Sequence, residues 1–286
     1  MRLPARKSVI QIALLLAAFI FLFGHAIKEM VHDWSINDNY SHGFLVPLIA
    51  AYMIWQKKHQ LSKIGAKPDG AGLLVILIGM CVFIVGNIGA ELFITRTAII
   101  ITIVGLCIYS FGLRIATAVA VPLSYLMFMI PLPVIIWNKI AFPLQFFAAR
   151  CTTLIVHCIG IPLLREGNVL YLSNTTLEVV DACSGLRSLT SLLALSAAFA
   201  YIVKLSRLNK WLLFLAAVPI AVIVNIVRLT ATVLLAKYVG PETAHGFLHD
   251  LSGIIVFFLA IIIFYTMYAA MNKIERFNGK SFPGDC

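Results

Sequence analysis

The stretch WLLFLAAVPIAVIVNIVRLTATVLLA, residues 211–236, contains a single charged side chain, Arg228, among mostly apolar residues. A helix rises by about 1.5 Å per residue, so a run of this length crosses the roughly 30 Å hydrocarbon layer of a bilayer. Strands of a membrane barrel alternate between apolar and polar side chains, and this run does not. The stretch therefore predicts a membrane-spanning helix.

The rest of the chain has a similar composition. Of its 286 residues, 61% are hydrophobic and 12% are charged, and the mean hydropathy is +0.98. No water-soluble core of this size needs so many apolar residues, so lipid is the expected surrounding of most of the chain. The formal net charge of +10 does not indicate a nucleic-acid partner, because the basic residues are spread over short loops.

Long apolar runs predict an all-α polytopic membrane protein with about eight transmembrane helices. The expected spans are 8–27, 41–56, 71–88, 97–112, 115–135, 185–203, 211–238 and 252–271. The first follows basic residues and is not followed by a small-residue cleavage pattern, which favours a retained signal anchor. No linker, low-complexity tract or internal repeat is found, so residues 1–286 are expected to form one integral membrane domain.

The basic residues predict the topology. The dense clusters are Arg2, Arg6 and Lys7; Lys57, Lys58, Lys63 and Lys67; Lys204, Arg207 and Lys210; and Lys273, Arg276 and Lys280. If all four are cytoplasmic, the chain is a bacterial inner-membrane protein with both termini inside and an even number of spans. Residues 138–161 then cannot be a simple span. Pro143 interrupts them and Arg150 lies near their middle, so a re-entrant or interfacial helix on the periplasmic side is expected.

Residues 166–181, EGNVLYLSNTTLEVVD, differ from the rest of the chain. β-favouring residues on both sides of a Ser173-Asn174 turn predict a short periplasmic β-hairpin. The hairpin leads directly to Cys183, where the next membrane helix begins. Free backbone N–H groups and the positive end of the helix dipole favour a thiolate there, which makes Cys183 a candidate nucleophile. The alternative is a small buried residue without chemistry.

The other cysteines give no sign of a shared site. Most of the six lie within apolar runs, and none shows CxxC spacing; they are Cys81, Cys107, Cys151, Cys158, Cys183 and Cys286. Neither a zinc site nor a disulfide framework is indicated. No cofactor and no metal are expected.

A second candidate group consists of Arg228, Asn225 and Arg187. An arginine within a span costs roughly 2.5–3.5 kcal/mol on insertion scales, so Arg228 should face the bundle interior or a polar cavity, unless it extends to the headgroups. Asn225 lies three residues earlier on the same helical face. Arg187, one turn after Cys183, is a weaker candidate because it can simply pair with Asp181 or with lipid headgroups.

A histidine completes the set. Residues 244–253, AHGFLHDLSG, form a short outer loop in which His249 is adjacent to Asp250. His249 could deprotonate the thiol or protonate a leaving amine, whereas a histidine in such a loop often serves only packing or the surface. The topology brings Cys183, Arg228 and His249 independently to one side of the bilayer.

Five motifs, in order, resemble those of the exosortases, membrane sorting enzymes of Gram-negative bacteria that are related to archaeosortases. They are NDNYSHGFLVPLIAAYMIW (37–55), FMIPLP (128–133), DACSGLRSL (181–189), NIVR (225–228) and HGFLHDLSG (245–253). The resemblance covers nearly the whole chain. It implies that Cys183, Arg228 and His249 are the catalytic set. Four further residues are expected to support the site or bind substrate, namely Asp181, Arg187, Asn225 and His42.

The implied activity is that of a cysteine peptidase or transpeptidase. Its substrates would be exported proteins that end in a sorting signal, namely a short motif such as Pro-Glu-Pro, a transmembrane helix and a basic tail. The enzyme would form a thioester on Cys183 and pass the acyl group to water or to a cell-envelope acceptor. Sortases are soluble β-barrel enzymes, so the similarity to them concerns roles only.

Two other classes of function remain open at this stage. A transporter or channel could line an anion path with Arg228, Arg187 and Arg150, although no inverted repeat is found. A membrane acyltransferase could use His249 on a lipid-linked donor, which would leave Cys183 without a role.

Overall fold

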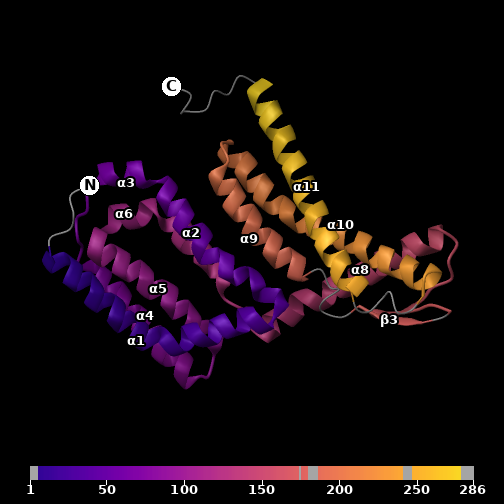
Figure 1. The fold of residues 1–286 in the computed structure, drawn as a ribbon, viewed down its shortest axis with the longest axis horizontal. Coiled ribbons are helices and arrows are strands. Elements are labelled where there is room, and N and C mark those ends of the chain that lie inside the picture. Colours follow the sequence, from indigo (N-terminus) through magenta and orange to yellow (C-terminus); the bar gives the residue numbers. More distant parts are fainter. Residues whose placement is uncertain (1–5, 174, 180–185, 241–246, 278–286) are drawn as a thin grey trace. The chain divides into compact units, whose positions relative to one another are not determined.

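The computed structural model describes residues 6–173, 175–179, 186–240 and 247–277, and it shows an all-α chain with a few short strands (Figure 1). The elements in chain order are α1 (Arg6–Ile36), the 3-10 helix η1 (Asp38–Phe44), α2 (Leu45–Gln56), α3 (Lys58–Ile64), α4 (Ala71–Ile88), α5 (Leu92–Phe111), α6 (Leu113–Ala118), α7 (Ala120–Tyr125), the 3-10 helix η2 (Leu126–Met129), α8 (Val134–Cys158), β1 (Leu164–Glu166), β2 (Val169–Tyr171), β3 (Thr176–Glu178), α9 (Leu186–Ile202), α10 (Arg207–Tyr238) and α11 (Phe247–Phe277).

The helices form two compact units, Met1–Pro133 and Val134–Cys286. Within the described residues, six helices are long and apolar enough to cross a membrane, namely α1, α4, α5, α8, α10 and α11. The apolar stretches Ala120–Met129 and Leu186–Ile202 are shorter. The all-α polytopic class is therefore confirmed. The exact number of crossings and the single domain stay predictions.

The segment expected as one span over 115–135 is broken into α6, α7 and η2. The break is caused locally by Pro122. Its backbone nitrogen has no hydrogen to donate, and in a continuous helix its ring would clash with the carbonyl of Ala118. Lys57 Nζ instead donates to the Ala118 carbonyl oxygen at 2.7 Å. The lysine at the end of α2 thus stabilises the carbonyl that the broken helix leaves without its usual partner.

Helices α4 and α5 approach each other very closely along a glycine seam. Gly72, Gly79 and Gly86 recur every seven residues on α4 and are buried. A Cβ atom added at any of them would lie closer than 3.0 Å to atoms of α5, among them backbone atoms of Tyr109 at Gly72. Small residues at such positions let helix backbones meet in lipid, where dispersion forces rather than the hydrophobic effect hold helices together.

Helix α1 packs on this pair through aromatic and small residues. Phe23 is fully buried, and its ring centroid lies 4.9 Å from that of Phe19 and 4.8 Å from that of Phe83 on α4. Ala98 and Ile99 of α5 complete the same cluster. The first unit therefore has a core in which α1, α4 and α5 all take part.

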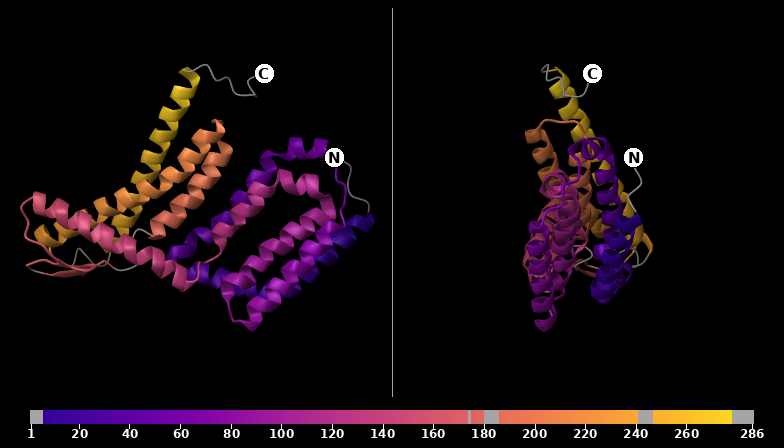
Figure 2. Two further views of the ribbon diagram at one scale, coloured as in Figure 1. Left: turned by 180° about the vertical axis from the view of Figure 1, so that it is seen from behind. Right: turned by 90° about the vertical axis from the view of Figure 1, so that its left-hand side faces the viewer.

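The second unit consists of α8–α11 and a small sheet, and α10 packs against each of the other three helices (Figure 2). The sheet lies where the hairpin is expected. Its order is β1-β2-β3, both pairs are antiparallel, and Tyr171 is opposite Thr176 across the turn that contains Ser173. Strand β1 had no counterpart in the sequence prediction.

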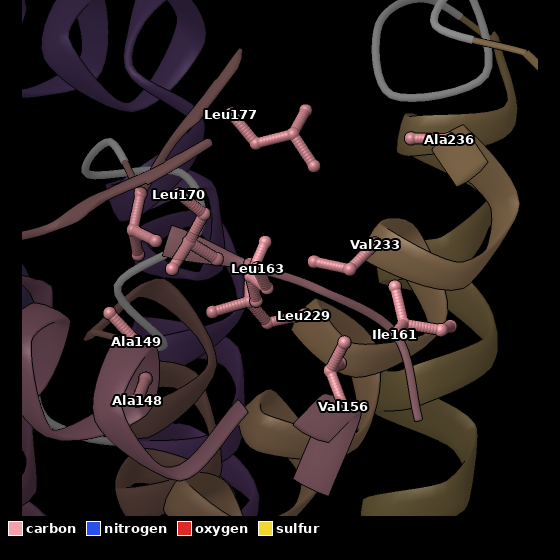
Figure 3. Close-up of a cluster of buried hydrophobic side chains, with 11 residues drawn as sticks. Ala148, Ala149, Val156, Ile161, Leu163, Leu170, Leu177, Leu229, Val233 and Ala236 are labelled. Carbon is pink, nitrogen blue, oxygen red and sulfur yellow. The ribbon is translucent and has the colours of Figure 1, made fainter. Parts of the chain in front are cut away.

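The sheet is held to the helices by one apolar cluster (Figure 3). The figure shows the side chains of α8, of the sheet and of α10 converging on a common centre. The buried members are Ala148, Ala149, Val156, Ile161, Leu163, Leu170, Leu177, Val179, Leu229, Val233 and Ala236. The last residue described before the Cys183 segment, Val179, is therefore anchored in the same cluster as Leu229, the neighbour of Arg228.

The glycine seam gives a first testable prediction. Gly72→Ala should lower the midpoint of thermal unfolding in detergent, because the new methyl group meets backbone that cannot move aside; overpacking typically costs about 1–3 kcal/mol. Gly24→Ala is the matched control. It makes the same change within α1, where a Cβ atom meets nothing within 4 Å. A midpoint for Gly72→Ala at or above that of the unchanged protein would contradict the close approach.

Candidate active site

The expected site residues are distributed over several elements of the chain. Arg228 and Asn225 lie in α10, and Arg187 lies in α9. His249 lies near the start of α11, and only its backbone is described. Cys183 and Asp181 lie outside the described residues. His42, in η1, belongs to the first unit.

Arg228 is buried and hydrogen-bonded to Asn225. Its side chain is 7% exposed and that of Asn225 is 2% exposed. Arg228 Nη2 donates to Asn225 Oδ1 at 3.0 Å. The spacing of three residues in a helix brings the two side chains onto one face. The expectation that Arg228 faces the protein interior rather than the headgroups is therefore met by its burial.

Helices α9 and α10 form an antiparallel pair, and its contacts define which residues lie at the same level. Ser196 Oγ donates to the carbonyl of Phe214 at 3.4 Å, and Lys210 Nζ donates to that of Tyr201 at 3.4 Å. We count residues from these two contacts toward the start of α9, where α10 runs in the opposite direction. Leu186 then lies at about the same height along the helix axes as Asn225. Arg228 lies one turn beyond. Long helical side chains point toward the N-terminus of their helix, so the guanidinium points back toward this level.

A similar count applies to α11, which runs antiparallel to α10. The carboxylate of Glu275, which is 4% exposed, accepts hydrogen bonds from the backbone N–H of Ser206 at 3.0 and 3.2 Å and from the Asn209 side chain. This fastens the end of α11 to the start of α10. Counting back along α11, the backbone of His249 lies about level with residues 232–235, one to two turns beyond Arg228.

Arg187 is only half-buried, in the first turn of α9. Its carbonyl accepts hydrogen bonds from Thr190 Oγ1 at 3.1 Å and from Ser191 Oγ at 2.9 Å. These contacts involve its backbone and belong to the helix. Arg228 is thus the more deeply buried of the two arginines.

His42 is hydrogen-bonded to the backbone of a segment that lies far away in the sequence. Its Nε2 donates to the carbonyl oxygen of Phe128 at 3.2 Å. Trp34 Nε1 donates to the carbonyl of Met129 at 2.8 Å, and Leu132 N–H donates to the Tyr40 hydroxyl. Three side chains from residues 34–42 thus bind three backbone groups of residues 128–132. We call this set the aromatic clamp, consisting of Trp34, Tyr40 and His42.

The electrostatics of the aromatic clamp agree with neutral side chains. Burial lowers the pKa of His42 below its ordinary value, and the Phe128 carbonyl opposes that shift. Burial raises the pKa of Tyr40 to about 12. Burial therefore favours a neutral phenol and a neutral imidazole, and the imidazole carries its proton on Nε2, where the Phe128 carbonyl accepts it.

Next to the aromatic clamp lies an ion pair that the sequence analysis missed. Arg96 Nη2 is 2.6 Å from Asp33 Oδ2, and the side chains are 2% and 39% exposed. The sequence did contain a signal for this ion pair. Placing an arginine in an apolar helix costs as much insertion free energy at position 96 as at position 228. The expected span began at residue 97, which left Arg96 just outside it. In the structure α5 begins at Leu92, so Arg96 lies inside the helix.

The comparison with known protein families identifies the chain. A family model described as transmembrane exosortase matches residues 34–266. The chain belongs to this family. No match was found among curated proteins or among solved structures. The matched range begins at Trp34 of the aromatic clamp and includes the whole of α8, α9 and α10.

Membership and the apolar helices together make this exosortase a multi-pass membrane protein. The described cysteines, Cys81, Cys107, Cys151 and Cys158, are all free thiols. In the described ranges, no group of three or more His, Cys, Asp or Glu side chains is placed to hold a metal ion.

The aromatic clamp gives the second prediction. Trp34→Phe keeps an aromatic ring but leaves the Met129 carbonyl without its donor in a buried place, which typically costs about 1–3 kcal/mol. The thermal unfolding midpoint should therefore fall. Trp55→Phe is the matched control, because Trp55 is 57% exposed and its ring meets Tyr52 and Lys58 through its face, not through its N–H. Equal midpoints for the two variants would rule out the role of the indole N–H.

Proposed function

We propose that this exosortase is a cysteine peptidase or transpeptidase of the bacterial inner membrane that cleaves the C-terminal sorting signals of exported proteins. The observation that carries the proposal is Arg228, a charged donor buried in α10 and held by Asn225 about level with the start of α9. Family membership adds a membrane sorting role. The proposed nucleophile, Cys183, precedes the start of α9 by three residues.

The chain itself limits where Cys183 can act. Three extended residues span at most about 11 Å, so Cys183 stays within that distance of Leu186. Leu186 is 1% exposed and about level with Asn225. The start of a helix also presents unpaired N–H groups and a positive dipole end, which favour the thiolate. These constraints support Cys183 and Arg228 acting on the same group.

The proposed reaction begins when Cys183 Sγ attacks the scissile carbonyl carbon. The carbonyl oxygen becomes an oxyanion that accepts hydrogen bonds from the Arg228 guanidinium. The tetrahedral intermediate collapses, the C–N bond breaks, and His249 gives a proton to the departing amine. The acyl group remains on Cys183 as a thioester. Water, or an amine or hydroxyl group of a cell-envelope acceptor, then attacks the thioester and releases the thiol.

The proposed substrates follow from the motif resemblance. They are exported proteins whose C-terminus carries a short motif such as Pro-Glu-Pro, a transmembrane helix and a basic tail. The active site is proposed to face the periplasm and both termini the cytoplasm, as the basic clusters suggest. Asp181, Arg187 and His42 are proposed as supporting residues. For His42 the hydrogen bond to Phe128 favours support of the backbone over direct contact with substrate.

A transporter with an arginine-lined anion path fits the described geometry less well. Arg150 is exposed on α8, Arg187 is half-buried, and Arg228 is buried with its guanidinium bonded to Asn225. An anion path needs its cations along one continuous polar surface. Different degrees of burial on three helices do not favour such a surface.

Cys183 provides the third prediction. Cys183→Ala should abolish processing of a co-expressed protein that carries a C-terminal sorting signal, because it removes the thiol on which the proposed thioester forms. The matched control replaces Cys81, Cys107, Cys151, Cys158 and Cys286 together and should still process the substrate. Substrate size on a gel is the measurement, and accumulation of each variant in the membrane is checked in parallel. Processing by Cys183→Ala at the ordinary rate would refute the proposal.

Arg228 provides the fourth prediction. Arg228→Lys keeps the positive charge but replaces a planar fork of donors with a flexible point charge. The processing rate should fall by about 10²–10³, the usual cost of losing one oxyanion donor. The variant should still accumulate, and Cys183 should still react with an alkylating probe. Processing by Arg228→Ala at the ordinary rate would remove Arg228 from the mechanism.

A further inference from the structure

Helix α8 has a clearly defined protein-facing side. Its buried residues recur at spacings of three and four, as one face of a helix requires. They are Trp137, Ala141, Gln145, Ala148, Ala149, Thr152 and Val156. Part of this face lies in the apolar cluster with α10 and the sheet. The remaining surface of α8 is free of that core.

The opposite side of α8 carries a basic stripe, which consists of Lys139, Arg150 and His157. At about 100° per residue, Lys139 lies roughly 140° and Arg150 roughly 160° from the centre of the buried face. The spacings of eleven and seven residues keep the three on one line along the helix. All three are exposed, although His157 Nε2 already donates to the Leu163 carbonyl at 2.7 Å, so Lys139 and Arg150 are the charged members that face away from the protein.

Exposure distinguishes Arg150 from Arg96 and Arg228. Arg96 in α5 and Arg228 in α10 are 2% and 7% exposed, and each pairs with a polar side chain. Arg150 forms no ion pair with any described residue, and neither does Lys139. If α8 crossed the bilayer, its basic stripe would face acyl chains. Arginine at mid-bilayer costs roughly 2.5–3.5 kcal/mol, and lysine a similar amount.

The flanks of the basic stripe are apolar. Phe146 lies beside it with 46% exposure, and Phe142, Phe147 and Leu154 lie farther round the helix with 50, 50 and 58%. A helix with basic residues between large apolar ones suits the boundary between headgroups and acyl chains. In Figures 1 and 2, α8 runs across α10 rather than alongside it. Helix α10 is long and apolar enough to span the membrane, so a helix that crosses it can lie along the surface.

We propose that α8 does not cross the membrane but lies in its interface on the side of the three-stranded sheet. There the basic stripe binds the phosphate groups of anionic phospholipids, and the apolar flanks enter the acyl-chain boundary. Each basic residue near an anionic surface contributes attraction that decays within a Debye length. Both ends of α8 then lie on one side of the bilayer. The proposal is independent of the proposed catalytic activity.

Thiol labelling tests the placement directly. Two variants with a single cysteine each are needed. The first retains only Cys158, at the end of α8, and the second carries only V134C, at the start of α8. Both positions are exposed. A membrane-impermeant maleimide is added to intact spheroplasts and to inside-out vesicles. Both cysteines should label in the same preparation and be protected in the other. Labelling of one cysteine in each preparation would mean that α8 spans the membrane and would overturn the proposal.

Lipid titration tests the bound partner. The purified full chain is heated in detergent with added phosphatidylglycerol or with phosphatidylcholine. Phosphatidylglycerol should raise the unfolding midpoint more than phosphatidylcholine, and the Lys139→Gln/Arg150→Gln double variant should lose most of that difference. The matched control is the Lys273→Gln/Arg276→Gln double variant, which removes two exposed charges from α11. This variant should keep the difference between the two lipids. Equal losses in both double variants would show a simple charge effect and refute the headgroup site.

Discussion

In a bilayer, every backbone polar group and every charge must find its partner within the protein, and this constraint accounts for most of the polar contacts described. Lys57 binds the carbonyl that Pro122 leaves without a partner. The aromatic clamp binds backbone groups where the chain leaves η2. Glu275 accepts hydrogen bonds from the backbone N–H of Ser206, the N-cap of α10, and from the side-chain amide of Asn209. Each contact joins segments that lie far apart in the sequence, so satisfying a local group also fixes the tertiary fold.

The same constraint explains how much the sequence revealed. Hydropathy identified the long helices α1, α4, α5, α10 and α11, since runs of apolar residues have few alternatives in lipid. The cost of a buried charge identified Arg228 and its partner Asn225. The break over residues 113–129 was missed because Pro122 lies in a run that is mostly apolar. Strand β1 was missed because Leu164–Glu166 is too short to show a period.

Long-range pairing was the part that sequence patterns could not supply. Residues 34–42 and 128–132 contain the donors and acceptors of the aromatic clamp, but nothing in either segment indicates the other as its partner. Arg96 was overlooked because a hydropathy boundary excluded it from its helix by one residue. Of the candidate site, the described chain contains the Arg228–Asn225 pair and the helix ends around it. The start of α9 and the start of α11 lie near Arg228 along the axis of α10. This follows because contacts of Ser196 and Glu275 fix α9 and α11 against α10.

The glycine seam bears on how a substrate could enter. The substrates proposed above end in a transmembrane helix, so they would approach sideways through the lipid and would need two helices of the enzyme to separate and admit them. Helices α4 and α5 are unsuited to be that gate, because their backbones approach closely at glycines along the whole length of α4 and leave little room that a side-chain movement could open. A lateral doorway must therefore lie at a looser seam, where side chains rather than backbones separate the helices.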